Sequence, residues 1–227
     1  MPPARLSVVI PALNEAAGMA AALQALAPLL ARGAQLLVAD GGSQDDTVAL
    51  ALAGGAQVIN APRGRALQMN AGAHQASGDL LLFLHADTQL PPDADRLIAQ
   101  ALAAGPCVWG RFDVRIEGHP RMLRVIAAFM NRRSRWSGIA TGDQALFMTR
   151  AAFDAVGGFP VQPLMEDIEM SKRLLKLSRP ACLRARVVTS GRRWETRGVW
   201  RTVLLMWRLR LAYWRGAAPE HLAELYR

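Results

Sequence analysis

Cysteine is scarce in this chain: its 227 residues include only Cys107 and Cys182. Two cysteines cannot form a disulfide framework, and the sequence has no CxxC pair of the kind that binds structural zinc. The scarcity excludes a small secreted domain stabilised by disulfides. It predicts a protein of a reducing, cytoplasmic compartment.

Long apolar runs are also missing. No uncharged stretch reaches the roughly 18 residues that a membrane-spanning helix needs. No signal peptide is visible, because Met1-Pro2-Pro3-Ala4-Arg5 leads directly into an apolar strand pattern. Hydrophobic residues nevertheless make up 52% of the chain, which excludes disordered and low-complexity classes. We therefore expect a globular protein.

Acidic residues are rare at the C-terminal end. Residues 178–227 contain 11 Arg and 3 acids, a net +8, whereas residues 1–177 carry a net +1. Such an excess is typical of a surface that meets phosphates, either of lipid headgroups or of a nucleic acid. It is equally explained by a GC-rich coding sequence, since 25 of the 27 basic residues are Arg.

Strand and helix patterns alternate through the first hundred residues. Apolar runs predict strands at 6–10, where Pro11 ends the run, and at 35–39, 56–60 and 80–84; helical spacing predicts helices at 15–31, from about 46, and at 65–75. This alternation predicts an α/β fold with a parallel sheet covered on both faces. Ligands of such sheets bind at the edge where the strands end.

The pattern changes in the second half of the chain. We expect strands at 108–116 and 145–148, and helices at 120–135, 150–156 and 166–176. Nothing resembles a linker. We predict one domain over residues 1–227, with a nucleotide-binding half (1–104), an acceptor and catalytic half (105–196) and a C-terminal helical tail (197–227).

Three acidic positions are candidates for chemistry. Asp87 ends His85-Ala86-Asp87 directly after the fourth predicted strand, where carboxylate oxygens suit Mn²⁺ or Mg²⁺ bridging a diphosphate. Asp40 follows the second strand and can accept hydrogen bonds from a base or ribose. Glu166 and Asp167 begin a helix after a turn-rich loop, where they suit a general base.

Each position also has a structural interpretation. Asp87 is suited to capping a turn or a helix. Ser43 or Asp45 is expected to cap the helix that starts near residue 46. Acids in a first helical turn, such as Glu166 and Asp167, are ordinary partners of the helix dipole.

Five segments, taken in order, resemble the family 2 glycosyltransferases, which have the GT-A fold. The segments are Ser7-Val8-Val9-Ile10-Pro11-Ala12-Leu13-Asn14-Glu15, Val38-Ala39-Asp40-Gly41-Gly42-Ser43-Gln44-Asp45-Asp46-Thr47, Leu84-His85-Ala86-Asp87, Gly142-Asp143-Gln144 and Glu166-Asp167. The resemblance covers about residues 5–175. More narrowly, the chain resembles the small bacterial radical-SAM/selenodomain-associated branch, which is linked to arsenosugar biosynthesis.

The resemblance implies an inverting transfer of a sugar from a nucleotide-diphosphate donor to a hydroxyl acceptor. It implies a mostly parallel central sheet flanked by helices, Asp87 as metal ligand and Asp167, with Glu166 second, as the base. The implied donor contacts are Pro11, Ala12, Asn14, Glu15, Asp40, Arg63, Asn70 and Ala86, and Arg65 is a further candidate for the diphosphate charge. We expect Asp143 and Gln144 on the acceptor side because they precede an apolar strand, although a capping or turn role is the alternative.

One departure from the family leaves alternatives open. The family usually has an acid where this chain has His85, a softer ligand that favours Mn²⁺ over Mg²⁺. A catalytically degenerate nucleotide-sugar-binding module is therefore one alternative. A nucleotidyltransferase of similar fold is a second alternative. Such an enzyme needs glycine and a basic residue in the loop after the first strand, and residues 11–15 contain neither. A dinucleotide-dependent oxidoreductase is disfavoured because GxGxxG is absent.

The expected C-terminal helix, 198–215, carries a tryptophan stripe. Trp200, Trp207 and Trp214 recur every seven residues and share one side, and an Arg follows each of them. Trp with flanking Arg is typical of a helix in a membrane interface and also of protein interfaces. We expect the opposite face to pack on the domain. The tryptophan stripe then has three possible locations: against the inner membrane face, buried within this domain, or buried in a homodimer. We expect no nucleic-acid partner.

Overall fold

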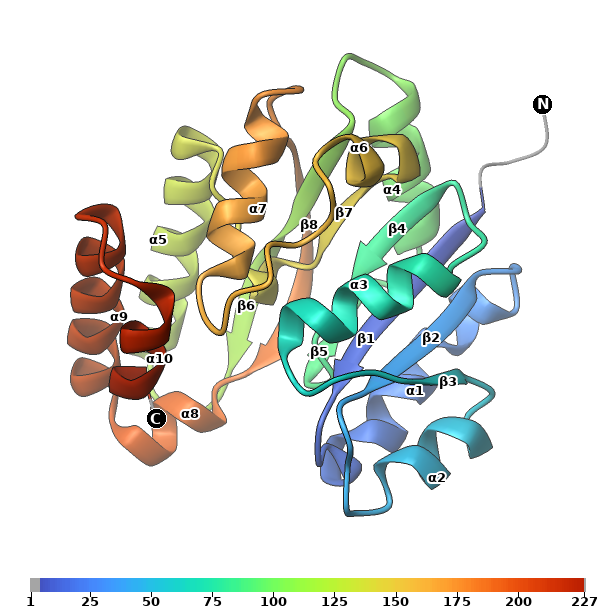
Figure 1. Ribbon diagram of the computed structural model, residues 1–227, viewed down its shortest axis with the longest axis horizontal. Helices are drawn as coiled ribbons and strands as arrows, with labels where there is room; N and C mark the ends of the chain where they lie inside the picture. Colours follow the sequence, from blue (N-terminus) through green and yellow to red (C-terminus); the bar gives the residue numbers. More distant parts are fainter. Residues whose placement is uncertain (1–4, 227) are drawn as a thin grey trace.

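A computed structural model describes residues 5–226 of the chain (Figure 1). Its first half contains β1 (Leu6–Ala12), α1 (Ala16–Leu30), β2 (Gln35–Asp40), α2 (Thr47–Ala53), β3 (Gln57–Asn60), α3 (Arg65–Gln75), β4 (Leu80–Phe83), β5 (Thr88–Gln89) and α4 (Ala94–Ala103). Its second half contains β6 (Trp109–Glu117), α5 (Met122–Ser137), the 3₁₀ turn η1 (Gly142–Gln144), β7 (Leu146–Thr149), α6 (Arg150–Ala155), α7 (Glu166–Leu175), β8 (Ala181–Ser190), α8 (Arg192–Arg197), α9 (Val199–Trp214) and α10 (Pro219–Tyr226).

One sheet runs through the molecule in the order β3-β2-β1-β4-β7-β6-β8-β5. Strands β1 to β4 are parallel, as is the pair β6 and β8. Strand β7 runs antiparallel to β4 and β6, and β5 runs antiparallel to β8. The predicted α/β fold is confirmed, with four parallel and three antiparallel pairings.

Helices cover both faces of the sheet. Alternate residues of β1 point to opposite faces, so Val8 and Ile10 pack with α1, α2, α4 and α5, whereas Val9 packs with α3, α6 and α7. A third apolar cluster joins Met165 and Ile168 to Leu209 of α9 and Leu222 of α10. The C-terminal helices are thus packed on α7, on the side of the molecule away from β1 to β3 (Figure 1).

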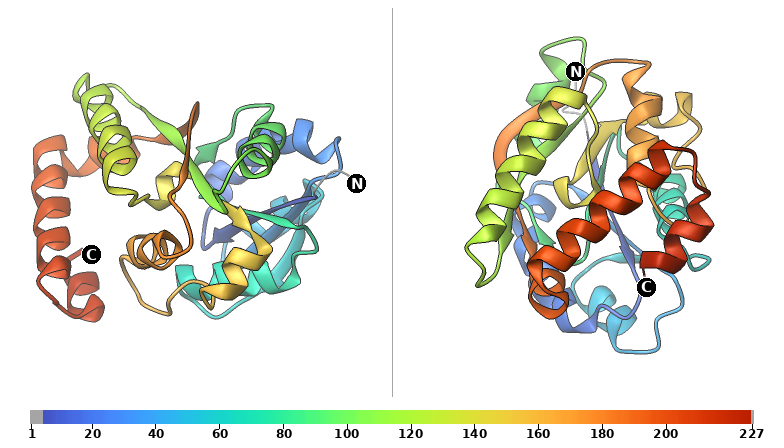
Figure 2. Two further views of the ribbon diagram at one scale, coloured as in Figure 1. Left: turned by 90° about the horizontal axis from the view of Figure 1, so that it is seen from above. Right: turned by 90° about the vertical axis from the view of Figure 1, so that its left-hand side faces the viewer.

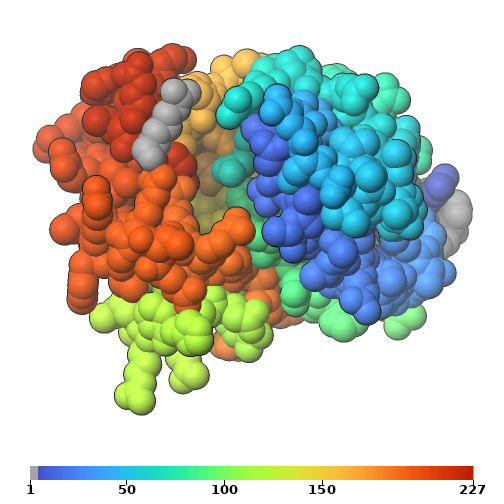
Figure 3. Space-filling model, turned by 90° about the horizontal axis from the view of Figure 1, so that it is seen from below, coloured from blue at the N-terminus to red at the C-terminus, as the bar shows by residue number. Residues whose placement is uncertain are grey.

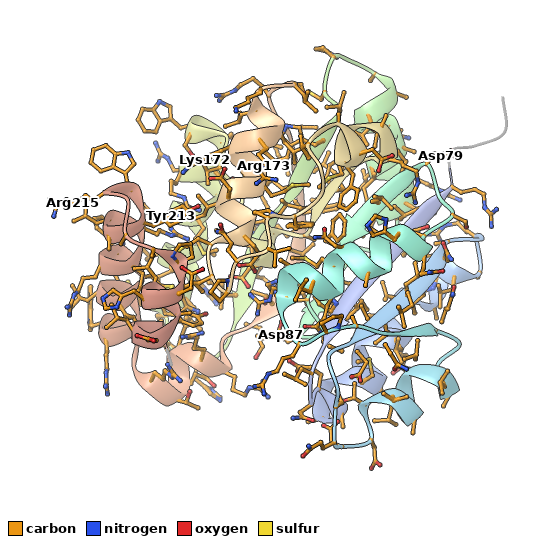
Figure 4. The ribbon with its side chains drawn as sticks, in the orientation of Figure 1. Asp79, Asp87, Lys172, Arg173, Tyr213 and Arg215 are labelled. Carbon is orange, nitrogen blue, oxygen red and sulfur yellow. The ribbon has the colours of Figure 1, made fainter. Side chains whose placement is uncertain are left out.

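Polar contacts reinforce the packing of α9 on α7. The hydroxyl of Tyr213 donates to Oε2 of Glu169 at 3.3 Å, and Nζ of Lys172 lies 4.8 Å from the centroid of the Tyr213 ring. Figure 4 shows Lys172 and Tyr213 close together between the two helices. The face of α9 opposite the tryptophan stripe therefore packs on the domain, as expected.

Pro11 lies inside β1, which corrects the prediction that it ends the strand. Its partner in β2 is Ala39. Pairing with β4 stops at Val9 and Phe83, and the Val9 carbonyl, which faces β4, accepts the last bond from Leu84. The backbone nitrogen of Pro11, two residues further along β1, faces the same side, beyond the last hydrogen bond to β4. Proline has no N–H to donate, and at this position the sheet loses no hydrogen bond.

The loop before α2 also differs from the prediction. The residue that precedes α2 is Asp46 rather than Ser43 or Asp45, but Oδ1 of Asp45 accepts from the amide of Thr47, the first residue of this helix, at 3.1 Å. In addition, Oγ of Ser43 accepts from the Asn14 amide and Oδ2 of Asp45 accepts from the Ala16 amide. These two side chains hold the loop after β2 against the loop after β1.

Among the strands and α-helices of residues 5–226, five had no counterpart in the sequence-based prediction: β5, α4, β8, α8 and α10. Of these, β8 matters most for the sheet, because it pairs with β6 from Gly110 to Glu117. Five of its ten residues are half-buried, Arg184 and Arg186 are exposed, and no apolar run is longer than three residues. Such a strand depends on its partner rather than on its own pattern.

Candidate active site

A cavity of about 260 Å³ lies beyond the carboxyl ends of β1 and β4. Nine of the predicted site residues line it: Pro11, Glu15, Arg65, His85, Ala86, Asp87, Asp143, Glu166 and Asp167. The space-filling view from below shows the molecule hollowed between the C-terminal segment and the first half of the chain (Figure 3). The fold thus gathers residues that are up to about 150 positions apart in the sequence.

The loop after β1 contributes Pro11 and Glu15 to the cavity and is held by the loop after β2. The amide of Asn14 donates to Oγ of Ser43 at 2.9 Å, and Oδ1 of Asn14 accepts from the Gln44 amide at 2.8 Å. The amide of Glu15 donates to Oγ1 of Thr47. Asn14 adopts a left-handed backbone with φ 54°, which asparagine tolerates better than most residues. Asn14 therefore holds the loop in place, and Glu15 reaches the cavity.

Asp40 lies at the end of β2 and is buried. Its carboxylate accepts hydrogen bonds from the Gly42 and Ser43 amides, each at 3.0 Å to Oδ2. Nearby, Nε2 of the buried Gln68 donates to the Ala12 and Ala39 carbonyls. Gln68, which sequence reasoning missed, therefore ties the ends of β1 and β2 together. Neither Asp40 nor Ala12 lines the cavity.

The acidic end of β4 holds His85 and Asp87. Nδ1 of His85 lies 3.3 Å from Oδ1 of Asp143, and Nε2 of His85 fills the space beside Gly142 that a side chain would need. Burial raises the pKa of Asp143, and the His85 hydrogen bond lowers it; the net pKa lies below the usual value. The His85 ring thus packs against the turn η1, with Nδ1 beside Asp143 and Nε2 beside Gly142.

Asp87 is the exposed carboxylate of this group, between the first half of the chain and the C-terminal helices (Figure 4). Among residues 5–226, no three His, Cys, Asp or Glu side chains are grouped to hold a metal by themselves. Mg²⁺ and Mn²⁺ at nucleotide sites commonly take one or two carboxylates and complete their shell with phosphates and water. The exposed carboxylate of Asp87, whose Oδ1 lies 3.4 Å from the Thr88 hydroxyl, fits such an ion, and the described residues form no closed protein cage.

The charge of Asp87 also affects the pKa of Glu15, which lines the same cavity. Burial and then the neighbouring charge of Asp87 raise the pKa of its carboxyl group. A cation placed at Asp87 would relieve this repulsion. The electrostatics of the cavity therefore favour positive charge at Asp87.

Glu166 and Asp167 begin α7 after Met165, whose backbone is left-handed at φ 66°. Such a conformation is costly for a non-glycine residue and is concentrated at functional sites. Oδ2 of Asp167 accepts from the Gly142 amide at 2.9 Å, and Oδ1 accepts from the Ile168 amide. Glu166 is buried and pairs with Arg65, whose Nη1 lies 3.6 Å from Oε1.

Both acids have a raised pKa. Burial is the main cause for each; for Glu166 the neighbouring Asp167 adds to it, and for Asp167 the Gly142 and Ile168 amides oppose it. A carboxylate with a raised pKa is a better proton acceptor than an exposed one. The pair therefore has the chemistry that a general base requires.

The C-terminal wall of the cavity was not predicted. The guanidinium of Arg193 lies 3.7 Å from the centroid of the Tyr226 ring, and Trp194, Thr202, Met206 and Arg210 also line the space. Burial raises the pKa of the Tyr226 hydroxyl. In the sequence, only the basic character of residues 178–227 pointed to this wall.

Several predicted residues do not reach the cavity. Asn70 clamps the backbone of Phe159, donating to its carbonyl at 2.9 Å and accepting from its amide at 2.8 Å. Gln144 is completely buried; its side chain bonds the Thr141 amide and the Ser134 hydroxyl. Arg63 is exposed on the loop before α3 and does not line the cavity. Gln144 thus has the turn role that was the alternative to acceptor binding.

The arrangement agrees with comparisons to known proteins. Residues 7–161 match the model of glycosyl transferase family 2. An undecaprenyl-phosphate 4-deoxy-4-formamido-L-arabinose transferase of Yersinia pestis is 29% identical over 152 residues, which is 61% of this chain and 46% of the relative. The chain therefore spans about half the length of this curated relative.

Solved structures show the same fold. S. aureus TarS in complex with UDP-GlcNAc superposes with a TM-score of 0.66 at 18% identity, over 82% of this chain and 58% of that one. A Mycobacterium tuberculosis glucosyl-3-phosphoglycerate synthase, solved with Mn²⁺, UDP and glucosyl-3-phosphoglycerate, superposes with a TM-score of 0.60 at 21% identity, over 82% and 71% of the two chains. With the family model matched from β1 to the loop before α7, this chain belongs to glycosyltransferase family 2.

Proposed function

We propose that this protein transfers a sugar, with inversion, from a nucleotide-diphosphate donor to a hydroxyl acceptor. One observation carries the proposal: a single cavity unites the loop after β1, the end of β4, Asp143 of η1 and the paired acids of α7. In the proposed division of the chain, residues 1–104 bind the nucleotide, 105–196 supply acceptor and catalytic groups, and 197–227 form a C-terminal helical tail. The similar proteins that bind UDP or UDP-GlcNAc support this type of donor.

The donor is proposed to lie along Pro11, Glu15 and Ala86. Asp40 and Asn14 are proposed to act indirectly. Their side chains accept hydrogen bonds from backbone amides and so hold the loops after β2 and β1 in position. Asp87 would hold a divalent ion, Mn²⁺ or Mg²⁺. When bound, such an ion supplies positive charge to the departing diphosphate. Arg65, half-exposed beside Glu166, provides a second positive charge on the same side of the cavity.

Asp167 is the proposed general base. In this step the acceptor hydroxyl oxygen bonds to the anomeric carbon while the bond from that carbon to the diphosphate oxygen breaks on the opposite face. The hydroxyl proton passes to the Asp167 carboxylate. The Gly142 and Ile168 amides orient this carboxylate. Glu166, held by Arg65, is the second candidate.

The acceptor is proposed to enter beside Asp143 and the C-terminal wall. Asp143 lines the cavity, whereas Gln144 supports the turn from behind. We place the chain in the radical-SAM/selenodomain-associated branch on the sequence resemblance alone. Its free Cys107 and Cys182 suit a reducing, cytoplasmic compartment.

Thermal shifts with nucleoside diphosphates, with and without Mn²⁺, test the proposal. A ligand that binds only the folded state raises the melting temperature. The nucleoside diphosphate with the matching nucleobase should therefore give the largest rise. Asp87→Asn should abolish the Mn²⁺-dependent part of the shift. Asp79→Asn is the matched control, because Asp79 is an exposed carboxylate at the opposite end of β4 (Figure 4).

Two results would contradict the proposal. A donor shift that is equally Mn²⁺-dependent in Asp87→Asn and the parent would remove Asp87 as metal ligand. Mn²⁺-dependent donor binding without hydrolysis of any sugar nucleotide, in any acceptor mixture, would instead favour the binding module.

A further inference from the structure

The outward sides of α5 and α9 form one exposed apolar surface, here called the α5–α9 face. Its apolar members are all exposed: Val125, Phe129 and Trp136 of α5, and Trp200, Leu204, Trp207, Leu211 and Trp214 of α9. The Phe129 and Trp207 rings stack with centroids 6.1 Å apart, which joins the two helices. Figure 2 shows both helices side by side on the left-hand side of the molecule.

This exposure is unusual for a folded chain. Trp136 is 85% exposed and Trp214 is 79% exposed, although large aromatic side chains are normally well buried. Contiguous apolar patches of this kind mark interaction surfaces. The tryptophan stripe is therefore not buried within this domain, which excludes one of the three locations considered from the sequence.

The same face is positively charged and contains no acid. Helices α5 and α9 together contain seven Arg and no Asp or Glu. Arg124, Arg132, Arg201 and Arg208 are exposed among the aromatic side chains, whereas Arg210 turns to the cavity. The face thus combines indoles with guanidinium groups that no acid on its own helices neutralises.

We propose that the α5–α9 face docks on an anionic membrane surface. Indole and leucine side chains suit the boundary between headgroups and acyl chains, and arginine reaches the lipid phosphates. A second copy fits this face less well, because an isologous dimer would set one basic surface against another. No helix within residues 5–226 is long and apolar enough to cross a bilayer, so the contact lies in the membrane plane.

Flotation with lipid vesicles tests this docking. The full-length protein is mixed with vesicles of phosphatidylcholine alone or with added phosphatidylglycerol, at low and high salt. We expect binding to the anionic vesicles, about tenfold weaker at high salt because salt screens the arginine charges. We also expect a shift of tryptophan fluorescence to shorter wavelength on binding, as indoles leave water.

Matched variants locate the surface. Leu204→Glu on the α5–α9 face is compared with Leu52→Glu on α2, since the two leucines are 63% and 57% exposed. Arg208→Glu is compared with Arg96→Glu on α4, both exposed. The two variants on the face should bind anionic vesicles about tenfold more weakly, and the two controls should bind as the parent does. Melting curves confirm that all four fold.

The proposal is overturned if the protein does not bind anionic vesicles at low salt. It is also overturned if Leu204→Glu and Leu52→Glu bind these vesicles equally well. A stable dimer that Leu204→Glu dissociates, with no vesicle binding, would overturn it as well and would show that the face joins two copies.

Discussion

The Gly142 amide donates a hydrogen bond to Oδ2 of Asp167 at 2.9 Å. This bond joins η1 to the first turn of α7, so the turn that holds Asp143 beside His85 also orients the proposed base. Gly142 has no side chain, and the His85 ring occupies the space that one would need. Three candidate residues therefore depend on one glycine.

Gly142→Ala should disrupt this arrangement. A methyl group at 142 collides with the His85 ring, so the ring or the turn must move, and overpacking of this kind costs about 1–3 kcal/mol of unfolding free energy. Turnover should fall by about tenfold or more because the Asp167 carboxylate loses its position. Denaturant unfolding and sugar-transfer kinetics measure the two effects.

Gly105→Ala provides the comparison, since a methyl group there meets no other atom within 4 Å. It should change neither quantity appreciably. Unchanged turnover in Gly142→Ala would show that the contact between Gly142 and Asp167 has no catalytic importance.

Asp167→Asn and Glu166→Gln should differ in turnover. Loss of a general base costs about 10²–10⁴ in rate. The donor affinity of Asp167→Asn should change little because the two amides that hold Asp167 belong to η1 and α7, whereas the donor is proposed to lie along the loop after β1. Glu166→Gln should have a smaller effect. Steady-state kinetics of both variants, with donor binding measured separately, would reveal this difference in turnover. Small and equal losses of turnover would mean that both acids only stabilise the start of α7.

The stability of the ligand-free protein should carry a signature of Glu166. Burial, with the neighbouring Asp167, raises the pKa of this carboxyl group, so the folded state keeps the proton to a higher pH than the unfolded chain does. The resulting stabilisation is complete below the ordinary glutamate pKa and is lost as pH rises through the raised value. Glu166→Gln should therefore melt at a higher temperature than the parent near neutral pH and at a similar temperature near pH 4.

Glu224→Gln serves as the control for this pH series, because the Glu224 side chain is 76% exposed. Its melting temperature should follow that of the parent across the series. A gap between Glu166→Gln and the parent that is absent near neutral pH, or that widens toward acid, would contradict the raised pKa.

Asn70→Ala should destabilise the fold. The Asn70 amide makes two hydrogen bonds to the Phe159 backbone, and leaving those peptide groups unpaired costs about 1–3 kcal/mol of unfolding free energy. Asn60→Ala, at the exposed end of β3, should cost much less. If Asn70→Ala instead weakens donor binding with no loss of stability, Asn70 contacts the donor, as the family resemblance implies.

Sequence patterns predicted a large part of the site because strand ends are locally encoded. The apolar run 80–84 followed by His85 and Asp87 identifies a strand and its polar end, and parallel strands bring such ends to one edge. Two of the residues that failed to reach the cavity, Asn70 and Gln144, have amide side chains. An amide bonds equally well to a ligand and to a distant backbone, so its sequence position does not distinguish the two uses.

Local patterns suffice to predict the α/β alternation, the acids that follow the strands and the seven-residue spacing of the tryptophans, since each depends on periodicities within one segment. The contact partners of these residues are set by tertiary packing. Asn70 meets Phe159, 89 residues away, Arg193 packs on Tyr226 to close the cavity, and Phe129 stacks on Trp207 to complete the α5–α9 face. These contacts join segments whose approach is set by the whole sheet and its covering helices, so no local pattern encodes them.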